Sequence, residues 1–584
     1  MNKTLIETAQ KQRKADLVLK NARIPSVFTG QILEGDLAIV EDRSAGIGSY
    51  EGKKEIDLNG ALVLPGLIDA HFHIESTMCT PASLSEALLR HGVTTVIADP
   101  HEIANAAGVD GLDFIMEDAQ NALIDYFFMI PSSVPSCDFE VNGAGELLAK
   151  DMKPYLNRKN VLGLAEVMRM NDVLSCDPRM QEKIELFEGR PIDGHAPGLS
   201  GSSLQAYRAA GIRNDHEAAT AQEALERLNY GFQLLIRQGS GARNLEDLLT
   251  GLVEQKIDLN RCSLCTDDMH IEDILSEGTI DHDLVLAQQC GTDFMDALRM
   301  GSLNTAVHYG LQDRGAIAPG YLADLVIIND PKKMDIQAVV RKGKVAWVSP
   351  SSTISGLSSL VEEQPVKNAP LPESITHSVH LPEFSLEELK EGFEDQYGIA
   401  MVEGQLYTRL LDKEDLQNEE DHPNILLSSE RYGKSGEYAL CPLVGYGLKN
   451  GAVAMSYAHD SHNVIACADR FEYLIEALKI LQEIQGGVVV IEKDHEPQVQ
   501  PLEAAGLMSQ KRPEQVSDKV LSMKNRLTEM GVNPGIDPFA TLSFLSLPVI
   551  PEVRLTPQGL FDVTHQTFLV RGKRKAVKAD HKEK

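Results

Sequence analysis

The 584-residue chain has no long hydrophobic run, and it has too few basic residues to balance its acidic ones. No segment approaches the roughly 20 consecutive apolar residues that span a bilayer, so the sequence predicts no membrane span. Lys and Arg number 55 against 86 Asp and Glu, a formal net charge of -31. This charge repels phosphate backbones and anionic lipid headgroups, which makes nucleic acids and membranes unsuitable partners.

Cysteine is also scarce, with eight residues scattered over the whole chain. Such spacing does not make a disulfide framework, and a reducing compartment would keep these residues as thiols. Residues 1–20 lack the apolar stretch of a signal peptide. We therefore expect a cytoplasmic protein.

The length and the changes of pattern along the chain predict an α/β protein of several units. Residues 1–64 read as short strands and turns, and residues 310–350 return to that pattern, so both parts are expected to form one small β-sandwich domain. Between them, residues 65–309 are expected to form a barrel. A linker at 351–372, a C-terminal α/β domain at 373–570 and a basic tail at 571–584 complete the prediction.

The barrel prediction rests on apolar runs that end in polar residues and are followed by helix-forming segments. Their spacing, roughly 20 to 35 residues, is that of a TIM-like (β/α)8 barrel. The eight runs are Val63 to His73, Val93 to Asp99, Tyr126 to Ser132, Val161 to Glu166, Pro191 to His195, Ile212 to His216, Gln233 to Arg237 and Cys262 to Asp267.

Polar residues at the carboxyl ends of barrel strands converge on one pocket. Here those residues are His71, His73, Asp99, Glu166, His195, His216 and Asp267. Any one of them alone is as easily explained by an ion pair, a helix cap or a core histidine. Together they are the residue types that bind divalent metal ions.

The order of the strands suggests how such ligands would divide between two ions. His71 and His73, two residues apart on one strand, project from the same face and can bind one ion. The eighth strand neighbours the first, so Asp267 can join them, and it can also act as a general base. Glu166 can bridge to a second ion held by the fifth and sixth strands. This chemistry alone permits zinc.

Several segments resemble the bacterial adenine deaminase family of the amidohydrolase superfamily. They are PGLIDAHFH at 65–73, ADPHEIAN at 98–105, IDGHAPGLSG at 192–201, CTDD at 265–268, GAIAPG at 315–320, AHDSHN at 458–463 and SLPVIPE at 546–552. The resemblance therefore extends over nearly the whole chain.

This resemblance implies a metal-bound hydroxide that removes the 6-amino group of adenine, giving hypoxanthine and ammonia in purine salvage. His71, His73 and Asp267 would bind the first ion, Glu166 would bridge, and His195 and His216 would bind the second. Manganese or iron would be the working metal. Asp267 would accept the proton of the hydroxide, and Glu217, Glu75 and Glu102 are candidates for the acid that protonates the ring.

Further residues are candidates for less central roles. His101, Gln238, Asp268 and Met269 lie near the predicted strand ends and are candidates for substrate binding, and His101 also for an accessory metal site. In the C-terminal domain, His459, Asp460 and His462 could form a lid or a subunit contact; a turn capped by its own side chains is the alternative. We also expect a homo-oligomer, most simply a dimer.

Three positions depart from the family pattern, with Gln238 in place of Glu, Met269 in place of Arg and Tyr432 in place of His. A changed pairing at a substrate-binding position alters specificity steeply. Two alternatives therefore stay open: a related amidohydrolase acting on another aminopurine, a cyclic amide or a cyclic amidine, and a catalytically weak homologue that binds a purine or a partner protein. The second would be expected to lose metal ligands first.

Overall fold

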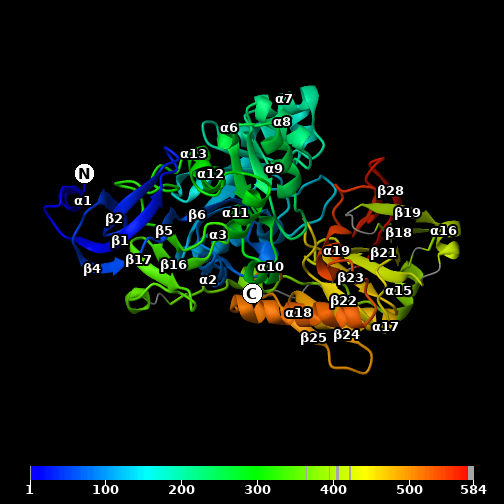
Figure 1. Ribbon diagram of the computed structural model, residues 1–584. Coiled ribbons are helices and arrows are strands. Elements are labelled where there is room, and N and C mark those ends of the chain that lie inside the picture. Colours follow the sequence, from blue (N-terminus) through cyan, green and yellow to red (C-terminus); the bar gives the residue numbers. More distant parts are fainter. Residues whose placement is uncertain (1, 363–364, 394, 403–406, 420–421, 576–584) are drawn as a thin grey trace.

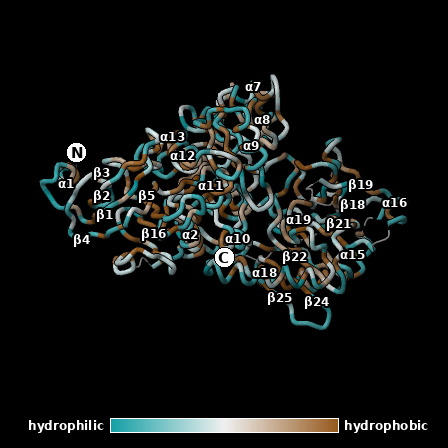
Figure 2. The backbone as a smooth tube through the Cα atoms, in the orientation of Figure 1, coloured by the Kyte–Doolittle hydropathy of each residue, from teal (hydrophilic) through white to brown (hydrophobic). Residues whose placement is uncertain are grey.

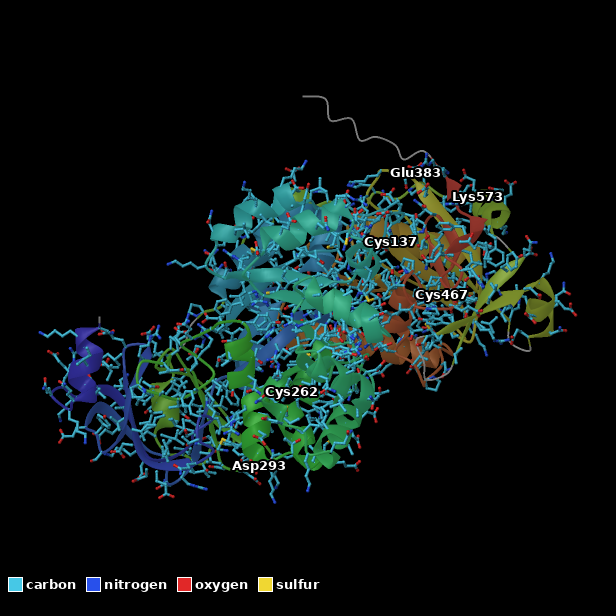
Figure 3. The ribbon with its side chains drawn as sticks, turned by 90° about the horizontal axis from the view of Figure 1, so that it is seen from above. Cys137, Cys262, Asp293, Glu383, Cys467 and Lys573 are labelled. Atoms are coloured by element: carbon cyan, nitrogen blue, oxygen red, sulfur yellow. The ribbon has the colours of Figure 1, made fainter. Side chains whose placement is uncertain are left out.

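The computed structural model describes residues 2–362, 365–393, 395–402, 407–419 and 422–575 (Figure 1). A small sheet domain, a central barrel and a C-terminal domain follow one another along the molecule. In Figures 1 and 3 the sheet domain and the C-terminal domain lie at opposite ends of the barrel. Among the described residues, no helix is both long and apolar enough to cross a membrane.

The described residues of the barrel contain eight strand positions in ring order, and neighbouring strands pair in parallel except the fifth and sixth, which belong to separate sheets. The strands are β6 (Leu67–His73), β7 (Val93–Ala98), β8 (Asp125–Ile130), β9 (Val161–Val167), β10 (Ile192–Gly194), β11 (Asn214–Asp215), β12 (Gln233–Arg237), and β13 (Cys262–Cys265) with β14 (Asp267–Asp268) as one interrupted strand. The ring closes where β14 pairs with β6. Between β10 and β11, the Arg213 N–H donates to the Ile192 carbonyl at 2.9 Å. All eight predicted runs therefore supply barrel strands, and the predicted fold class is confirmed.

Helices follow the strands and surround the barrel (Figure 1). Their first turns show why they begin where they do: Thr220 and Glu223 form a capping box at the start of α8 (Ala221–Asn229), and Asp177 accepts two backbone N–H groups at the start of α6 (Pro178–Leu186). The longer helices are α2 (Pro81–Arg90), α3 (His101–Asp118), α6 (Pro178–Leu186), α7 (Gly201–Ala209), α8 (Ala221–Asn229), α9 (Leu245–Glu254) and α11 (Ile280–Gln289).

The small domain is one eight-stranded sheet built from both sides of the barrel sequence. Its strands are β1 (Ala15–Pro25), β2 (Ile32–Val40), β3 (Arg43–Gly48), β4 (Gly52–Asp57), β5 (Leu62–Pro65), β15 (Leu325–Ile328), β16 (Ile336–Arg341) and β17 (Lys344–Val348). The two halves meet where β15 pairs antiparallel with β5. Because Pro65 ends β5 and Leu67 begins β6, this sheet fixes the entry of the first barrel strand.

The C-terminal domain is built around a nine-stranded, largely antiparallel sheet. The strands are β18 (Tyr397–Met401), β19 (Thr408–Asp412), β20 (Asn424–Ser429), β21 (Glu437–Val444), β22 (Gly451–Met455), β23 (Val464–Ala468), β24 (Gly487–Glu492), β25 (Gln498–Pro501) and β29 (Lys573–Arg574). A second sheet contains β26 (Val553–Thr556), β27 (Gly559–Asp562) and β28 (Thr567–Arg571). The main helices are α17 (Phe471–Glu483), α18 (Pro513–Glu529) and α19 (Pro538–Phe544).

The basic tail predicted at 571–584 divides into two parts. Residues 573–574 form β29, which pairs with β21, and Lys575 contacts Glu388 at 2.6 Å, so this part belongs to the C-terminal domain. Residues 576–584 lie outside the described residues. The other domain boundaries stay predictions.

Hydrophobic segments alternate with hydrophilic ones throughout the chain, and hydrophilic stretches follow outer loops such as the one between β24 and β25 (Figure 2). All eight cysteines are free, as the sequence predicts, and Figure 3 places Cys262 in the barrel, well away from Cys467 in the C-terminal domain.

The C-terminal domain packs directly on the barrel. The backbone of Ser509 exchanges two hydrogen bonds with the loop before α2, donating to Met78 at 2.8 Å and accepting from Thr80 at 3.1 Å. Lys434 donates to the carbonyl of Asn142 at 2.9 Å, in the segment between β8 and β9. One buried hydrophobic cluster runs through both domains. The carboxyl ends of the barrel strands therefore face another domain.

Candidate active site

The six predicted metal ligands come together at the carboxyl ends of the barrel strands. In the first group, Asp267 Oδ1 lies 3.4 Å from His71 Nε2 and 3.0 Å from His73 Nε2. All three side chains are buried. The His73 Nδ1 group lies 3.1 Å from the backbone carbonyl of Asp99, to which it can donate, and this leaves Nε2 free to bind a cation.

The second group of predicted ligands gathers around Glu166. One oxygen of its carboxylate, Oε2, faces the histidines that follow β10 and β11. Glu166 Oε2 lies 2.9 Å from His195 Nδ1 and 3.2 Å from His216 Nε2. Glu166 Oε1 lies 3.6 Å from His73 Nε2, in the first group. The carboxylate therefore stands between the two groups, as a bridging ligand would.

These donors fit two divalent cations. Two donors bound about 2.1 Å from one ion at tetrahedral angles lie about 3.4 Å apart, and the separations in both groups are close to that length. The Nε2 atoms of His71 and His216 are buried and have no hydrogen-bond partner among the described residues. Their rings stack face to face, with centroids 4.3 Å apart. Buried, unpaired nitrogen atoms of this kind are costly unless a cation binds them.

The position of Asp267 depends on an irregularity in the eighth strand. Asp267 has a φ of 60°, in the left-handed region, and it begins β14 directly after Thr266, the one residue between β13 and β14. Asp is one of the few residue types that adopt this conformation readily. The interruption removes the simple alternation of side chains, so that both Asp267 and Asp268 line the same cavity.

Arg237, at the end of β12, is a site residue that the sequence analysis overlooked. Its Nη1 donates to Glu217 Oε1 at 2.7 Å and to Asp267 Oδ2 at 2.9 Å, and its Nη2 donates to Glu217 Oε2 at 3.1 Å. Its position was visible in the sequence, because Arg237 closes the seventh predicted strand. A guanidinium is not a metal ligand, so the metal-ligand pattern at the other strand ends does not point to Arg237.

The surrounding charges set the protonation of the two carboxylates that Arg237 holds. Burial alone would raise the pKa of Asp267, but the nearby imidazoles, His216 first, and the guanidinium of Arg237 hold that pKa well below its ordinary value. Burial would likewise raise the pKa of Glu217, and Arg237 again lowers it strongly. Both groups are therefore ionised at neutral pH.

A cavity of about 950 Å³ opens over the ligands and is lined by both the barrel and the C-terminal domain. The barrel contributes five of the six ligand side chains, all except His71, together with Arg237. The C-terminal domain contributes Tyr457, His459, Asp460 and Phe544, with the rings of His459 and Phe544 stacked 4.9 Å apart. The cavity is therefore bounded by residues nearly 500 positions apart in sequence.

The predicted substrate-binding residues divide into two pairs. His101 and Asp268 line the cavity. Gln238 and Met269 are not among the lining residues: Met269 packs in the hydrophobic core, and the backbone of Gln238 forms an isolated bridge with Arg243. Both are buried, and their role in substrate binding stays an untested prediction.

The three candidate acids also differ in position. Glu217 and Glu102 line the cavity, whereas Glu75 does not. Glu75 is fully buried and accepts the backbone N–H of Ile103 at 2.9 Å, near the start of α3. This contact gives Glu75 a local structural role.

Of the predicted lid residues, His459 and Asp460 line the cavity and His462 lies behind it. His462 Nδ1 accepts the backbone N–H of Ala458, so its Nε2 carries the proton and faces Glu102 Oε2 at 3.3 Å. Tyr457 donates to Ser76 at 3.2 Å, and Ser76 in turn donates to Asp268. Buried hydrogen bonds thus join the two domains at the site.

Comparisons with known proteins match both parts of this architecture. Residues 62–236 and 237–346 match the amidohydrolase family, and residues 405–567 match the adenine deaminase C-terminal domain. The chain is 40% identical over 567 residues to an adenine deaminase of Desulfitobacterium hafniense (strain Y51), covering 96% of this chain and 97% of that protein. The chain belongs to the adenine deaminase family.

Two further adenine deaminases show the same extent of similarity. That of Geobacillus kaustophilus (strain HTA426) is 41% identical over 97% of this chain and 98% of its own length. That of Bacillus subtilis (strain 168) is 38% identical over 96% and 97%, respectively. Amidohydrolases are metal-dependent, and the described residues of this adenine deaminase family member contain several groups that could hold a metal ion.

Proposed function

We propose that this protein catalyses the hydrolytic deamination of adenine to hypoxanthine and ammonia. The observation that carries the proposal is the arrangement of six ligands, five of them buried and His195 half-buried, in two groups around Glu166, in a chain similar to adenine deaminases over nearly its whole length. A C–N bond of a cyclic amidine is cleaved in this reaction, and water supplies the oxygen.

Two divalent cations are proposed to occupy the two ligand groups. When bound, they would supply a water molecule that is nucleophilic at neutral pH. His71, His73 and Asp267 would hold one ion, His195 and His216 the other, and Glu166 both. The family resemblance favours manganese or iron, and the donor set is also suited to zinc.

Asp267 is the proposed proton acceptor. Its Oδ1 faces the imidazoles of His71 and His73, and its Oδ2 accepts from Arg237. The guanidinium fixes the orientation of the carboxylate and keeps it ionised, as a base must be before it accepts a proton. Arg237 is therefore proposed as a positioning residue for Asp267.

Glu102 is the proposed proton donor to the ring. Glu217 is poorly suited to this role because Arg237 binds both of its oxygens and stabilises the charged form. Glu102 lines the cavity and is surrounded by other acidic groups: burial first, and then Glu75 and Asp268, raise its pKa well above the ordinary value. A protonated carboxyl at this position can donate to substrate.

Substitution of the three acids one at a time tests this assignment. We expect Glu102→Gln to lower kcat by about 10²- to 10⁴-fold, the usual contribution of a general acid. Glu75→Gln, which does not reach the cavity, is the matched control and should have a much smaller effect. If Glu102→Gln were nearly as active as wild type while Glu217→Gln lost activity, the donor would be Glu217.

The positions of Gln238 and Met269 bear on the alternative substrates. Both depart from the family pattern, but neither lines the cavity, so their sequence differences give no contact reason for another substrate. The weak-homologue alternative has no support either, because all six ligand positions are filled and lie close together. Adenine therefore remains the proposed substrate.

The direct test offers the manganese-loaded protein adenine, other aminopurines and cyclic amides, with ammonia release as the readout. We expect the highest kcat/KM with adenine and no turnover after chelation of the metal. Turnover of another substrate without turnover of adenine would contradict the proposal. A cytoplasmic location and a homodimer are further parts of the proposal, to be tested by fractionation and by light scattering.

A further inference from the structure

Two buried residues at the edge of the metal-ligand cluster have no role in the mechanism proposed above. Asp99 follows β7, and His101 begins α3 two residues later; their exposed fractions are 1% and 5%. Within the part of the chain that the structure describes, neither oxygen of the Asp99 carboxylate has a hydrogen-bond partner, and neither does His101 Nδ1. A carboxylate buried in this way is costly unless a cation neutralises it.

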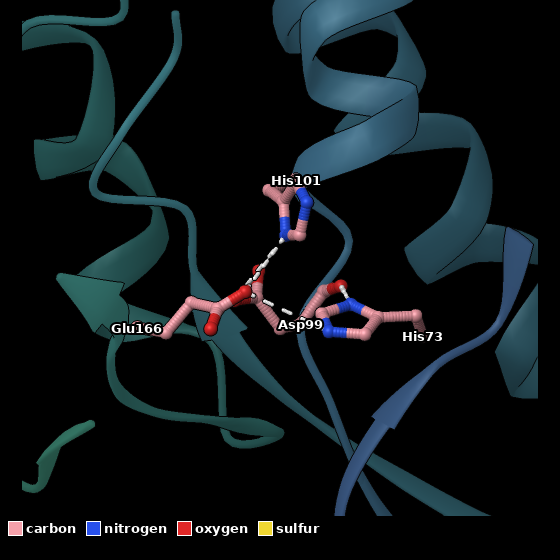
Figure 4. A group of neighbouring side chains, drawn as sticks. All are labelled: His73, Asp99, His101 and Glu166. Carbon is pink, nitrogen blue, oxygen red and sulfur yellow. Dashed lines mark hydrogen bonds and ion pairs between the residues drawn. The ribbon is translucent and has the colours of Figure 1, made fainter. Parts of the chain in front are cut away.

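These unpaired atoms point toward one another and toward Glu166 (Figure 4). His101 Nδ1 lies 3.5 Å from Asp99 Oδ2 and 3.4 Å from Glu166 Oε1. Together with His73, these residues form a group whose ligand atoms all lie within 4.8 Å of one another. The group comes from three different barrel strands and the start of one helix.

The distances from His101 Nδ1 to the Asp99 and Glu166 carboxylates are characteristic of ligands that bind the same cation. A direct hydrogen bond between an imidazole and a carboxylate measures about 2.7 to 3.2 Å, which is shorter than either separation. Two donors on one cation at tetrahedral angles lie about 3.4 Å apart, which is also the separation of His71 Nε2 from Asp267 Oδ1 in the first ligand group. The side chains of Asp99 and His101 thus stand at the distance of co-ligands.

We infer that Asp99, His101 and the Oε1 atom of Glu166 form a third divalent-cation site beside the two proposed ones. The site rests on the proposed function only in sharing Glu166 with the proposed pair. Imidazole nitrogen with two carboxylates selects a first-row transition ion such as manganese, iron or zinc over magnesium or calcium. The third ion would neutralise Asp99 and fix His101, which lines the substrate cavity.

Metal stoichiometry tests this inference without relying on activity. The full-length protein is stripped with a chelator, reloaded with Mn²⁺, passed through a desalting column and measured by inductively coupled plasma mass spectrometry. We expect about three ions per chain in wild type and about two in both Asp99→Asn and His101→Asn. Asp460→Asn is the matched control, because Asp460 lines the same cavity but only approaches the other His101 nitrogen, at 4.0 Å. It should keep three ions.

Two ions in wild type, or an unchanged count in Asp99→Asn and His101→Asn, would overturn the inference. Anomalous diffraction from Mn²⁺-loaded wild-type crystals is the second measurement, and it needs no variant to fold. A peak between Asp99 and His101 is expected, and its absence beside two other peaks would contradict the site. Three ions without adenine turnover would instead contradict the proposed function while leaving the third site intact.

Discussion

At the scale of single residues, Arg237 links Asp267, the proposed proton acceptor, to Glu217. It is the one basic side chain that contacts both Asp267 and Glu217 among the described ion pairs. Its planar guanidinium donates in two directions at once, which a lysine ammonium on a flexible stem cannot reproduce with the same geometry. The orientation of the proposed base therefore depends on a residue that binds no metal.

Replacement of Arg237 should lower kcat by a larger factor than it lowers the amount of bound metal. We expect Arg237→Gln to reduce kcat by roughly 10²-fold or more, because Asp267 loses a fixed, charged partner, and Arg237→Lys to recover only part of that loss. Steady-state kinetics together with metal analysis measures both effects. Arg243→Lys, a more exposed site in the following loop, is the control. Full activity in Arg237→Gln would show that Asp267 needs no such support.

The sequence allowed much of this site to be predicted, because strand ends in a barrel converge and the ligand types are distinctive. The six predicted ligand positions are brought together in the structure, although their roles stay predictions. The reach of long side chains could not be read from sequence. The double contact of Arg237 and the turning of Glu75 away from the cavity depend on rotamers that only packing determines.

At the scale of elements, the site depends on the close approach of neighbouring barrel strands. Gly163 lies in β9, three residues before Glu166. A Cβ atom at this position would lie 1.9 Å from the carbonyl oxygen of Pro191, just before β10. The atom in conflict belongs to the backbone, so no side chain can move to relieve the contact. Only glycine allows the strands carrying Glu166 and His195 to lie this close.

Gly163→Ala should therefore force β9 and β10 apart. We expect a loss of about 1 to 3 kcal/mol in stability, seen as a lower Tm, together with weaker binding of the ions that Glu166 is proposed to hold. Differential scanning calorimetry and metal titration measure the two effects. Gly392→Ala, where the nearest atom would be at an ordinary 3.5 Å, is the control. Equal melting temperatures for the two variants would contradict this account of the strand contact.

Element positions could be predicted from sequence because short apolar runs with regular spacing admit few other folds. The boundaries of β12 at Gln233–Arg237 coincide with the predicted run. The break between β13 and β14 could not be predicted, because the left-handed backbone of Asp267 leaves no mark in the hydrophobic pattern. That break is also what brings both Asp267 and Asp268 to the cavity.

At the scale of the whole molecule, the domains are joined by charged contacts as well as by the shared core. Asp125, at the start of β8, lies 2.9 Å from both Arg314 and Lys342 and also contacts Arg341 of β16. Burial would raise the pKa of Asp125, but these three cations, Arg341 first, hold it far below its ordinary value. This ionised carboxylate joins the barrel to the small sheet domain.

The Asp125 contacts should give stability that depends on pH in a definite direction. A carboxylate whose pKa is lowered by folding stabilises the protein above its unfolded pKa, about 3.9, and this contribution is lost as the pH falls toward the folded pKa. Asp125→Asn should therefore lower Tm clearly at pH 7, by the equivalent of about 2 to 4 kcal/mol, and less below pH 4. Thermal unfolding at both pH values measures the difference. A difference that grows in acid would contradict the assignment.

Docking of the C-terminal domain over the barrel could not be predicted from sequence beyond a suggested lid. His459 and Asp460 indicate this docking in the sequence, as polar residues suited to a lid. Their neighbours at the site, such as Ser76 and Phe544, lie some 80 to 380 residues away along the chain. Contacts over such separations depend on the assembled domains. The cavity is lined by both domains, and the relatives match the chain over both.

The most direct test of the central claim is the yield of hypoxanthine and ammonia from adenine as Mn²⁺ is added back to the metal-free protein. The account predicts one ammonia per hypoxanthine, a rate that rises with bound metal until both proposed ligand groups are filled, and almost no product from Asp267→Asn at the same metal content. A metal-loaded wild-type protein that releases no ammonia from adenine, or an Asp267→Asn variant as active as wild type, would contradict it.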